Sequence, residues 1–436
     1  MSAPIAFDAT RLFLGPLAVT PRGIDRVDLG YARFFFETWP GDCVGTLPTP
    51  WGVRWFDRQR VIRGLARLEE LWSETLQPDE DHVLLKIKTR LSGQHGSETG
   101  NFPEYDRPII RPVFRLLDLV SVTRFSFGAS VIRSLPKNSI YLNVGQLSLE
   151  ILLFVSGLRH RPDVKPVFML HDVIPLESPE FFLPGAPRSR WKIIDNTARY
   201  ASGLIVTSAA AREPVLNALR LRGRAEIPVE TVPLPVAPIF LEKDRPDEEL
   251  GTHDYFVVCG AIEPRKNHLL LLNVWRELVR RGGNRAPKLV VVGSPTRDVT
   301  GVAPLLRTLE QCPPLQDQVI FARGLSSPAL RRLIVHAKAL LMPSFAEGFG
   351  LPVIEALALG TPVIASDLPA HREIAGDLAI YRDPTDQSGW LAAICMFAEG
   401  NRAATEIRNR VSAYQPQTWH DYFIRINRFL KTFEEV

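Results

Sequence analysis

The sequence has no apolar run long enough to cross a lipid bilayer, which takes about 18 residues. The nearest candidate, residues 151–155, is short and directly follows Glu150. The first ten residues, MSAPIAFDAT, also lack a basic region followed by an apolar stretch. We therefore expect neither a membrane-spanning helix nor a secretory signal.

Cysteine is scarce in this chain. The 436 residues include four, Cys43, Cys259, Cys312 and Cys395, and no two of them form a CxxC pair. This spacing argues against the usual zinc-binding patterns and gives no disulfide framework. Scattered cysteines are typical of buried thiols in a reducing compartment, so the predicted location is the cytoplasm.

Three motifs that identify common enzyme classes are missing. No GxGxxG follows a predicted strand, which argues against a nicotinamide-dependent dehydrogenase. Neither a P-loop nor a GxSxG elbow occurs. The Asp-x-Asp formed by Asp79 and Asp81 lies in the acidic run PDEDH, and we interpret it as a solvated turn rather than a metal site.

The small excess of positive charge is confined to the first part of the chain. Residues 1–245 carry 31 Lys and Arg against 27 Asp and Glu, whereas the remainder carries 21 of each. No basic stripe with interleaved aromatic residues occurs, so nucleic acid is not an expected partner. Local arginine runs could face an anionic membrane or a pyrophosphate-bearing acceptor, or simply form a solvated helix face. These runs are Arg54, Arg58, Arg60, Arg63 and Arg67, then Arg107, Arg111 and Arg115.

A chain of 436 residues exceeds one ordinary core, and its pattern predicts two domains. Short apolar, β-rich runs alternate with segments of helical spacing, such as residues 24–38 and 188–200. This alternation is typical of parallel sheets covered by helices on both faces. The predicted fold class is α/β, with two doubly wound Rossmann-like domains. The predicted strands are PIAFDA, DCVGTLP, HVLLKIK, SIYLNV, KPVFMLHDV, GLIVTS and VETVPLPV, then YFVVCGA, KLVVVGS, QVIFARG, ALLMPS, TPVIASD and LAIYRD.

The predicted domain boundary lies in residues 241–254, which are charged, are broken by a proline and a glycine, and lack an apolar period. Residues 89–107 are polar and are predicted to form a long loop within the first domain. The amphipathic segment 419–433 must bury its apolar face against another element. Ligands of open parallel sheets bind beyond the carboxyl ends of the strands, so the expected site is a cleft between the two domains.

Glu347 and Glu355 flank a glycine-rich turn in the segment PSFAEGFGLPVIEALALG. Glu347 follows a predicted strand, and Glu355 lies about one turn into the helix predicted to start near Pro352. Gly348 and Gly350 permit close approach of a ligand to the backbone, and the helix start suits a phosphate. The two carboxylates could accept hydrogen bonds from a sugar and from a ribose diol. Alternatively, Glu347 is a helix cap and Glu355 is a buried carboxylate with a local partner.

Arg265 and Lys266 follow the first predicted strand of the second domain, in YFVVCGAIEPRKN. Cations at the start of a helix oppose the helix dipole, which favours an anionic ligand nearby. At a strand's carboxyl end they could neutralise a diphosphate, although exposed lysines at such positions are also ordinary.

Two further candidates lie in the first domain. His171 ends the strand in KPVFMLHDVIP and could hydrogen-bond a sugar hydroxyl or move a proton, or it could be structural. Gly23, in VTPRGIDRV, lies between a strand and a helix, where a backbone N–H could meet the phosphates of a donor.

Together these segments resemble the retaining glycosyltransferases of family four, which have the GT-B fold. The resemblance is close over residues 255–377 and rests on EPRKN, on ARGLSSPALRRL, and above all on the glutamate pair with its flanking sequence. In the first domain it is limited to RGIDRV, HDVIP and IVTSAAARE. It implies an acceptor-binding domain at 1–245, a nucleotide-sugar domain at 250–415, and a C-terminal helix, 417–436, that crosses back onto the first domain.

The resemblance also implies roles for individual residues. Glu347 would contact the transferred sugar, and Glu355 would take the ribose hydroxyls. Arg265 and Lys266 would stabilise the leaving diphosphate, and His171 would lie close to the reacting sugar. The remaining donor contacts would come from the backbone of Gly348, Phe349, Gly350 and Leu351, from Gly23, and near Leu325 for the nucleobase. Many members have an arginine where this chain has Gly260 and Ala261, so the family's two-cation pattern differs here.

The implied reaction is sugar transfer with retention, in which the leaving phosphate accepts the proton of the acceptor. No cofactor or divalent metal is expected, because Arg265, Lys266 and helix N-termini would supply the charge. The expected donor is a GDP-sugar rather than a UDP-sugar, with mannose favoured. The expected acceptor is a saccharide or a lipid-linked oligosaccharide of polysaccharide biosynthesis, reached from the cytoplasm or the inner face of the membrane. The alternatives are a catalytically silent nucleotide-sugar-binding scaffold and a nucleotide-sugar epimerase.

Overall fold

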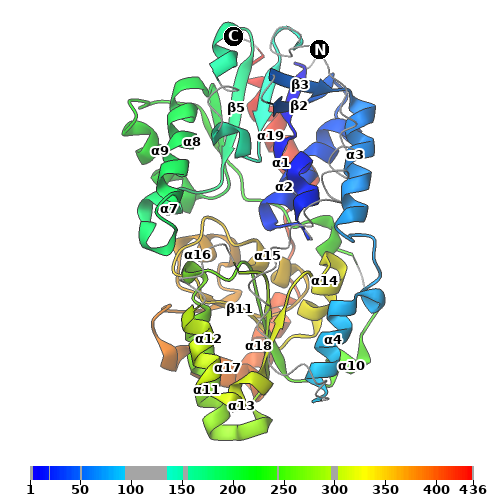
Figure 1. Ribbon diagram of the computed structural model, residues 1–436, viewed down its shortest axis with the longest axis vertical. Coiled ribbons are helices and arrows are strands. Elements are labelled where there is room, and N and C mark those ends of the chain that lie inside the picture. The colour runs from blue at the N-terminus through cyan, green and yellow to red at the C-terminus, as the bar shows by residue number, and fades with distance from the viewer. Residues whose placement is uncertain are drawn as a thin grey trace.

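The computed structural model describes residues 3–18, 20–49, 52–93, 135–150, 156–242, 245–295 and 303–434. These residues form two α/β units, each built on one sheet, which lie one above the other in Figure 1. Residues 107, 111 and 115 of the second arginine run, and most of the predicted loop at 89–107, lie outside the described residues.

The first sheet has seven strands in the order β3-β2-β1-β4-β5-β6-β7. All neighbours are parallel except β2 and β3, which form an antiparallel pair at one edge. The predicted strand pattern omitted β3. The bounds are β1 Ile5–Asp8, β2 Cys43–Thr49, β3 Gly52–Phe56, β4 Ile140–Asn143, β5 Lys165–Leu170, β6 Gly203–Val206 and β7 Val229–Thr231.

Helices flank this first sheet and connect its strands. Helix α2 continues into a short π-helical turn over Phe34–Thr38. The helices of this part of the chain are α1 Thr10–Leu14, α2 Gly23–Arg33, α3 Arg58–Leu71, α4 His82–Leu91, α7 Ile174–Glu177, α8 Ala186–Tyr200, α9 Ala209–Arg220 and α10 Glu248–Gly251.

The second sheet has six parallel strands in the order β10-β9-β8-β11-β12-β13, which confirms the six strands predicted for this half. Its strands are β8 Tyr255–Cys259, β9 Lys288–Val292, β10 Val319–Ala322, β11 Leu340–Met342, β12 Val363–Ser366 and β13 Ala379–Arg382. Its helices are α11 His268–Gly282, α12 Ala303–Glu310, α13 Pro313–Gln318, α14 Ser327–His336, α15 Leu351–Ala358, α16 Pro369–Ala375, α17 Gln387–Ala398 and α18 Arg402–Val411.

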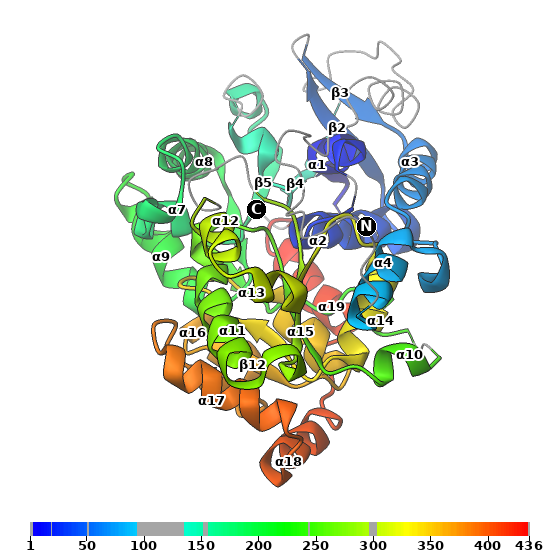
Figure 2. The same cartoon turned by 60° about the horizontal axis from the view of Figure 1, so that its bottom comes forward.

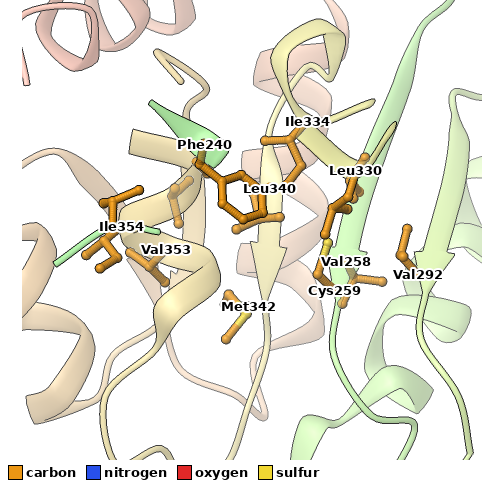
Figure 3. Packing of buried hydrophobic residues seen from close by; sticks show 14 of the residues in the cluster. Phe240, Val258, Cys259, Val292, Leu330, Ile334, Leu340, Met342, Val353 and Ile354 are labelled. Atoms are coloured by element: carbon orange, nitrogen blue, oxygen red, sulfur yellow. The ribbon is translucent and has the colours of Figure 1, made fainter. Parts of the chain in front are cut away.

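The core of the second unit explains why its strands are continuously apolar. Every residue of β8, β11 and β12 is buried, because helices cover both faces of a parallel sheet. Figure 3 shows Val258, Leu340 and Met342 of the strands packed among Leu330 of α14 and Val353 of α15. The same core includes Phe240, which precedes the boundary segment.

The predicted strand HVLLKIK is wrong, because these residues form helix α4. The side chain of Asp81 caps the helix by accepting from the backbone N–H of Val83 and Leu84. The buried residues Leu84, Ile87 and Leu91 follow helical spacing rather than alternation.

Helix α4 packs on the second unit rather than on the sheet that precedes it in the chain. Arg90 donates to the carbonyl of Gln316 at 2.9 Å, and Lys88 pairs with Asp247 at 2.6 Å. Both views show α4 beside α14 (Figures 1 and 2). Asp79, which we predicted to lie in a solvated turn, pairs with Arg332 of α14 at 2.6 Å. This segment therefore joins the two units a second time, besides residues 241–254.

The last helix, α19 Trp419–Lys431, lies against α2 of the first unit. The hydroxyls of Tyr31 and Tyr422 are 2.6 Å apart, and the indole N–H of Trp419 donates to the carbonyl of Val236. A Cβ atom on Gly30 would lie 2.3 Å from the ring of Trp419, so only glycine permits this packing. Within the described part of the chain, no helix is long and apolar enough to span a membrane.

Candidate functional site

The predicted donor residues follow two strands that are neighbours in the second sheet. Strands β8 and β11 pair in parallel, with Leu341 opposite Val258. Their carboxyl ends therefore open at the same edge, which brings the segment after β8 next to the segment after β11. The backbone N–H of Phe345 donates to the carbonyl of Arg265, which joins the two segments directly.

Glu347 accepts hydrogen bonds from both predicted cations. Its Oε1 lies 2.5 Å from Nζ of Lys266, and its Oε2 lies 2.9 Å from Nη1 of Arg265. The Ser344 hydroxyl also donates to Oε1, and Glu263 holds the other side of the Arg265 guanidinium at 2.6 Å. The three predicted residues thus form one cluster whose side chains are each about one-tenth exposed.

Glu347 and Arg265 of this cluster both stay ionised. Burial raises the pKa of Glu347, but the charges of Arg265 and Lys266 outweigh burial and hold that pKa well below its ordinary value. Burial lowers the pKa of Arg265, but the charges of Glu347 and Glu263 raise it by more. The pKa of Arg265 is therefore above its ordinary value. Glu347 is therefore an ionised hydrogen-bond acceptor near neutral pH, and it does not carry an exchangeable proton there.

The glycine turn leads from Glu347 into α15. Gly350 has a φ of 109°, a left-handed conformation that favours glycine, and precedes the first helical residue, Leu351. Pro352 is the second helical residue, where its missing N–H costs no hydrogen bond. A Cβ atom on Gly23, the first residue of α2, would lie 2.7 Å from Cδ1 of Leu351, so the start of α2 touches this turn.

The first unit touches this turn along its own strand ends. A Cβ atom on Gly348 would lie 2.8 Å from the carbonyl oxygen of His171 and 2.7 Å from Cβ of Asp172, both just after β5. The hydroxyl of Ser208, after β6, donates to the carbonyl of Gly348 at 2.7 Å. The two units therefore meet where the carboxyl ends of both sheets converge.

A carboxylate strengthens this contact from the other side. Glu373 of α16 accepts hydrogen bonds from the backbone N–H groups of Ala209 and Ala210 at 2.8 and 3.0 Å. These two N–H groups form the first turn of α9, whose positive end favours a carboxylate. We did not identify Ser208 or Glu373 from the sequence, because their partners lie more than 130 residues away.

His171 is buried, and its Nε2 lies 3.1 Å from the carbonyl of Val144. A carbonyl only accepts, so Nε2 carries the proton and Nδ1 is the acceptor. Burial lowers the pKa of His171 to about 4, which Asp172 only partly opposes, so the ring is neutral at pH 7. Its backbone adjoins Gly348, although its Nε2 proton is already engaged.

Glu355 is buried in α15, and a first-domain arginine reaches it. Nη1 of Arg26, one turn after Gly23 in α2, lies 3.4 Å from Oε1 of Glu355. Burial raises the pKa of Glu355, and the charge of Arg26 opposes this effect. Glu74 adds to the increase, so the pKa of Glu355 is above its ordinary value. Arg26 also donates to the hydroxyl of Ser327 at 2.9 Å, two residues after Leu325. Arg26 lies within RGIDRV, but the sequence pattern alone did not predict a role for it.

Two arginines of the first run, Arg58 and Arg67, have local partners. Arg58 donates to the carbonyls of Trp39 and Gly41, and Arg67 pairs with Glu70 on the same helix. These contacts fit the alternative of an ordinary helix surface. As for metals, no group of three or more His, Cys, Asp or Glu side chains could hold an ion within the described ranges.

The second unit matches a known protein family. Residues 241–416 match the model of the family described as glycosyl transferases group 1. The O-antigen chain mannosyltransferase RfbU of Salmonella typhimurium is 34% identical over 164 residues, which are 37% of this chain and 43% of the relative. The serotype-specific mannosyltransferase WbdA of Escherichia coli is 30% identical over 228 residues, 49% of this chain and 27% of the relative. The chain therefore spans less than half the length of either relative.

Solved structures share the whole fold. The sucrose-phosphate synthase of Thermosynechococcus elongatus has a TM-score of 0.61 at 16% identity, covering 99% of this chain and 98% of that one. The HepE protein of Anabaena, solved with UDP-glucose, has a TM-score of 0.58 at 16% identity, covering 99% and 97%. These matches confirm the predicted GT-B fold.

Proposed function

Residues 241–416 belong to the glycosyl transferases group 1 family, and from this premise we propose that the chain is a retaining glycosyltransferase. The observation that carries the proposal is the convergence of Arg265 and Lys266 on Glu347, at the carboxyl ends of β8 and β11. Two adjacent cations that converge on the Glu347 carboxylate, with Glu263 on the far side of Arg265, suit a ligand that carries both a diphosphate and sugar hydroxyls.

Each residue then has a part in transfer. Lys266 and Arg265 stabilise the charge that develops on the leaving diphosphate, without a divalent metal. Glu347 accepts from a hydroxyl of the transferred sugar, and Glu355 accepts from the ribose hydroxyls. Because Glu347 is held ionised by two cations, it orients the sugar rather than moving a proton.

In this scheme the bond from the anomeric carbon to the phosphate oxygen breaks, and the acceptor oxygen attacks from the same face. The acceptor's proton passes to the departing phosphate oxygen, so that no second carboxylate is needed. The protein contributes positioning, because the first-domain residues after β5 meet the donor turn at Gly348.

The sugar is a hexose, with mannose favoured because both relatives are mannosyltransferases, and the base is guanine rather than uracil. The acceptor is a saccharide or a lipid-linked oligosaccharide of surface polysaccharide assembly, met at the cytoplasmic face of a membrane.

Thermal unfolding and donor hydrolysis test the proposal. The full chain is heated with GDP, UDP, GDP-mannose and UDP-glucose, and release of free sugar is followed in parallel. We expect stabilisation by at least one nucleotide diphosphate and slow hydrolysis of its sugar. Stabilisation without hydrolysis or transfer to any saccharide would favour the silent scaffold. Absence of stabilisation by every nucleotide would exclude the donor site.

A further inference from the structure

Asp172 is a first-unit carboxylate that lies against the donor turn and has no part in the proposed reaction so far. It follows β5, directly after His171. A Cβ atom on Gly348 would lie 2.7 Å from Cβ of Asp172 and 3.3 Å from its Oδ2. Gly348 adjoins Glu347, which we propose holds the transferred sugar. Asp172 therefore brings a carboxylate of the first unit to the residue next to Glu347.

The two oxygens of Asp172 have different surroundings. Oδ1 accepts from the backbone N–H of Ile174 at 3.2 Å, a local turn that aspartate commonly makes. Nη2 of Arg190 lies 3.8 Å from the same oxygen, which is too long for a hydrogen bond. Oδ2 has no hydrogen-bond partner among the residues that the structure describes, and the side chain is 28% exposed. The local turn accounts for Oδ1 and leaves Oδ2 as an acceptor on a partly exposed side chain.

Arg190 of α8 is held beside Asp172 by Gln146, which follows β4. The amide of Gln146 donates to the carbonyl of Met169 at 3.1 Å and accepts from Nη1 of Arg190 at 2.8 Å. Gln146 has a φ of 66°, a left-handed conformation that is uncommon for residues other than glycine. Such strained backbone conformations gather at functional sites. Segments after β4 and β5 thus fix a guanidinium next to the Asp172 carboxylate.

The chemistry that remains for Asp172 follows from the proposed function, on which this inference rests. There the proton of the attacking hydroxyl passes to the departing phosphate oxygen, so that hydroxyl needs no protein base. A carboxylate accepts hydrogen bonds from hydroxyls and repels a diphosphate. The cations proposed for the diphosphate belong to the second unit, whereas Asp172 faces the turn from the first. A second hydroxyl of the incoming acceptor sugar therefore suits Asp172.

We propose that Asp172 is an acceptor-positioning residue, whose Oδ2 accepts from the hydroxyl next to the attacking hydroxyl on the acceptor sugar. Arg190 keeps the carboxylate beside the turn. The acceptor is then a saccharide with two neighbouring free hydroxyls, and a simple methyl glycoside carries the whole recognised group. Holding the second hydroxyl orients the first towards the donor, which speeds transfer.

Partition of the donor between water and a sugar tests this. The full chain receives GDP-mannose or UDP-glucose, with the methyl glycosides of mannose, galactose, glucose and N-acetylglucosamine as acceptors. Water has no second hydroxyl, so donor hydrolysis does not depend on the proposed contact. In Asp172→Asn, transfer to the best glycoside should fall about 10-fold or more, while hydrolysis and nucleotide affinity stay unchanged.

The asparagine has a single oxygen, which stays with the N–H of Ile174. Its amide nitrogen then takes the place of Oδ2 and can only donate. Asp195→Asn is the matched control, because Asp195 of α8 forms an exposed ion pair with Arg222. This variant should transfer and hydrolyse as wild type does.

Monodeoxy analogues of the best glycoside identify the second hydroxyl, once the linkage of the product has identified the attacking one. Removing one neighbour of the attacking hydroxyl should lower wild-type transfer about 10-fold. The same removal should make no further difference in Asp172→Asn, since the contact is already lost. A residue that only stabilised the fold would not cancel the effect of one particular hydroxyl.

The other outcomes overturn the proposal. An equal fall of hydrolysis and transfer in Asp172→Asn would mean that Asp172 acts on the donor or on the fold. Donor hydrolysis without transfer to any methyl glycoside, or wild-type transfer that tolerates loss of every neighbouring hydroxyl, would exclude the second contact while the donor site stands. Absence of stabilisation by every nucleotide diphosphate would instead refute the proposed function itself. The wild-type deoxy series needs no variant, so poor folding of Asp172→Asn does not protect the inference.

Discussion

Nζ of Lys266 lies 2.5 Å from Oε1 of Glu347, although the two residues are 81 positions apart in the chain. The contact joins the segments that follow β8 and β11, and it is the centre of the proposed donor site. Arg265 lies on the other carboxylate oxygen of Glu347 and also pairs with Glu263, so the two cations stay next to each other at the strand ends with a carboxylate on either side.

Replacing Lys266 by Ala should weaken binding of nucleotide diphosphates about 10-fold or more. The variant removes one of the two buried cations proposed to bind the diphosphate, and a hydrogen bond to a charged group contributes about 1.5–3 kcal/mol. Titration calorimetry with GDP and UDP measures the change. Lys338→Ala, which breaks a partly exposed ion pair with Asp254, is the matched control and should leave the affinity unchanged. Equal affinities in wild type and Lys266→Ala would remove Lys266 from the site.

Replacing Glu347 by Gln should separate binding from transfer. The amide keeps the shape of the side chain but lowers its strength as an acceptor, and it releases Arg265 and Lys266 for the diphosphate. GDP affinity should therefore be retained or increased, while the transfer rate falls about 100-fold. Calorimetry and a radiolabelled-sugar transfer assay measure the two effects. Wild-type transfer by this variant would contradict the role given to Glu347.

The donor half of the site could be predicted from sequence because each part of it is local. A strand, a glycine turn and a helix start are encoded within the twelve consecutive residues from Leu340 to Leu351. Parallel sheets then place the ends of neighbouring strands together, so Arg265, Lys266 and Glu347 needed no long-range information beyond the fold class.

The cross-domain residues could not be predicted in the same way. Arg26 gains its role only when α2 meets α14 and α15, and nothing in its own sequence neighbourhood shows this. The strand prediction for HVLLKIK was wrong for a related reason. Its apolar residues fit a short strand, and the choice of helix depends on the Asp81 cap and on packing against the second unit.

Replacing Gly348 by Ala should impair transfer without unfolding the chain. The added Cβ would lie 2.8 Å from the carbonyl oxygen of His171 and 2.7 Å from Cβ of Asp172, so the two units would have to separate. Separation of the two units would misplace the acceptor relative to the donor, which should lower the transfer rate about 100-fold. Small-angle scattering should show a larger radius of gyration than for wild type.

Gly282→Ala is the control for this variant. Gly282 has a φ of −114°, and no atom lies within 4 Å of an added Cβ, so its transfer rate should match wild type. Normal transfer by Gly348→Ala together with an unchanged radius of gyration would show that the close contact at Gly348 is not required.

Stability should fall as the pH drops below about 6.5, because two buried histidines resist protonation. Burial lowers the pKa of His171 to about 4 and that of His268 to about 3, the latter helped by the charge of Lys266. The unfolded chain binds these protons near pH 6.5 and the folded chain does not. Folding is therefore disfavoured progressively as the pH falls from 6.5 towards each folded pKa, and above pH 7 neither histidine contributes a slope.

His268→Leu isolates one of the two contributions. Both ring nitrogens of His268 are buried without a hydrogen-bond partner among the described residues, so leucine of similar size should fold normally at pH 7. Urea unfolding at pH 7 and pH 5 should show that wild type loses about 2 kcal/mol more free energy of unfolding than the variant over this interval. The comparison cancels groups common to both proteins. Parallel stability curves for wild type and His268→Leu would mean that His268 is protonated in the folded chain as readily as in the unfolded one.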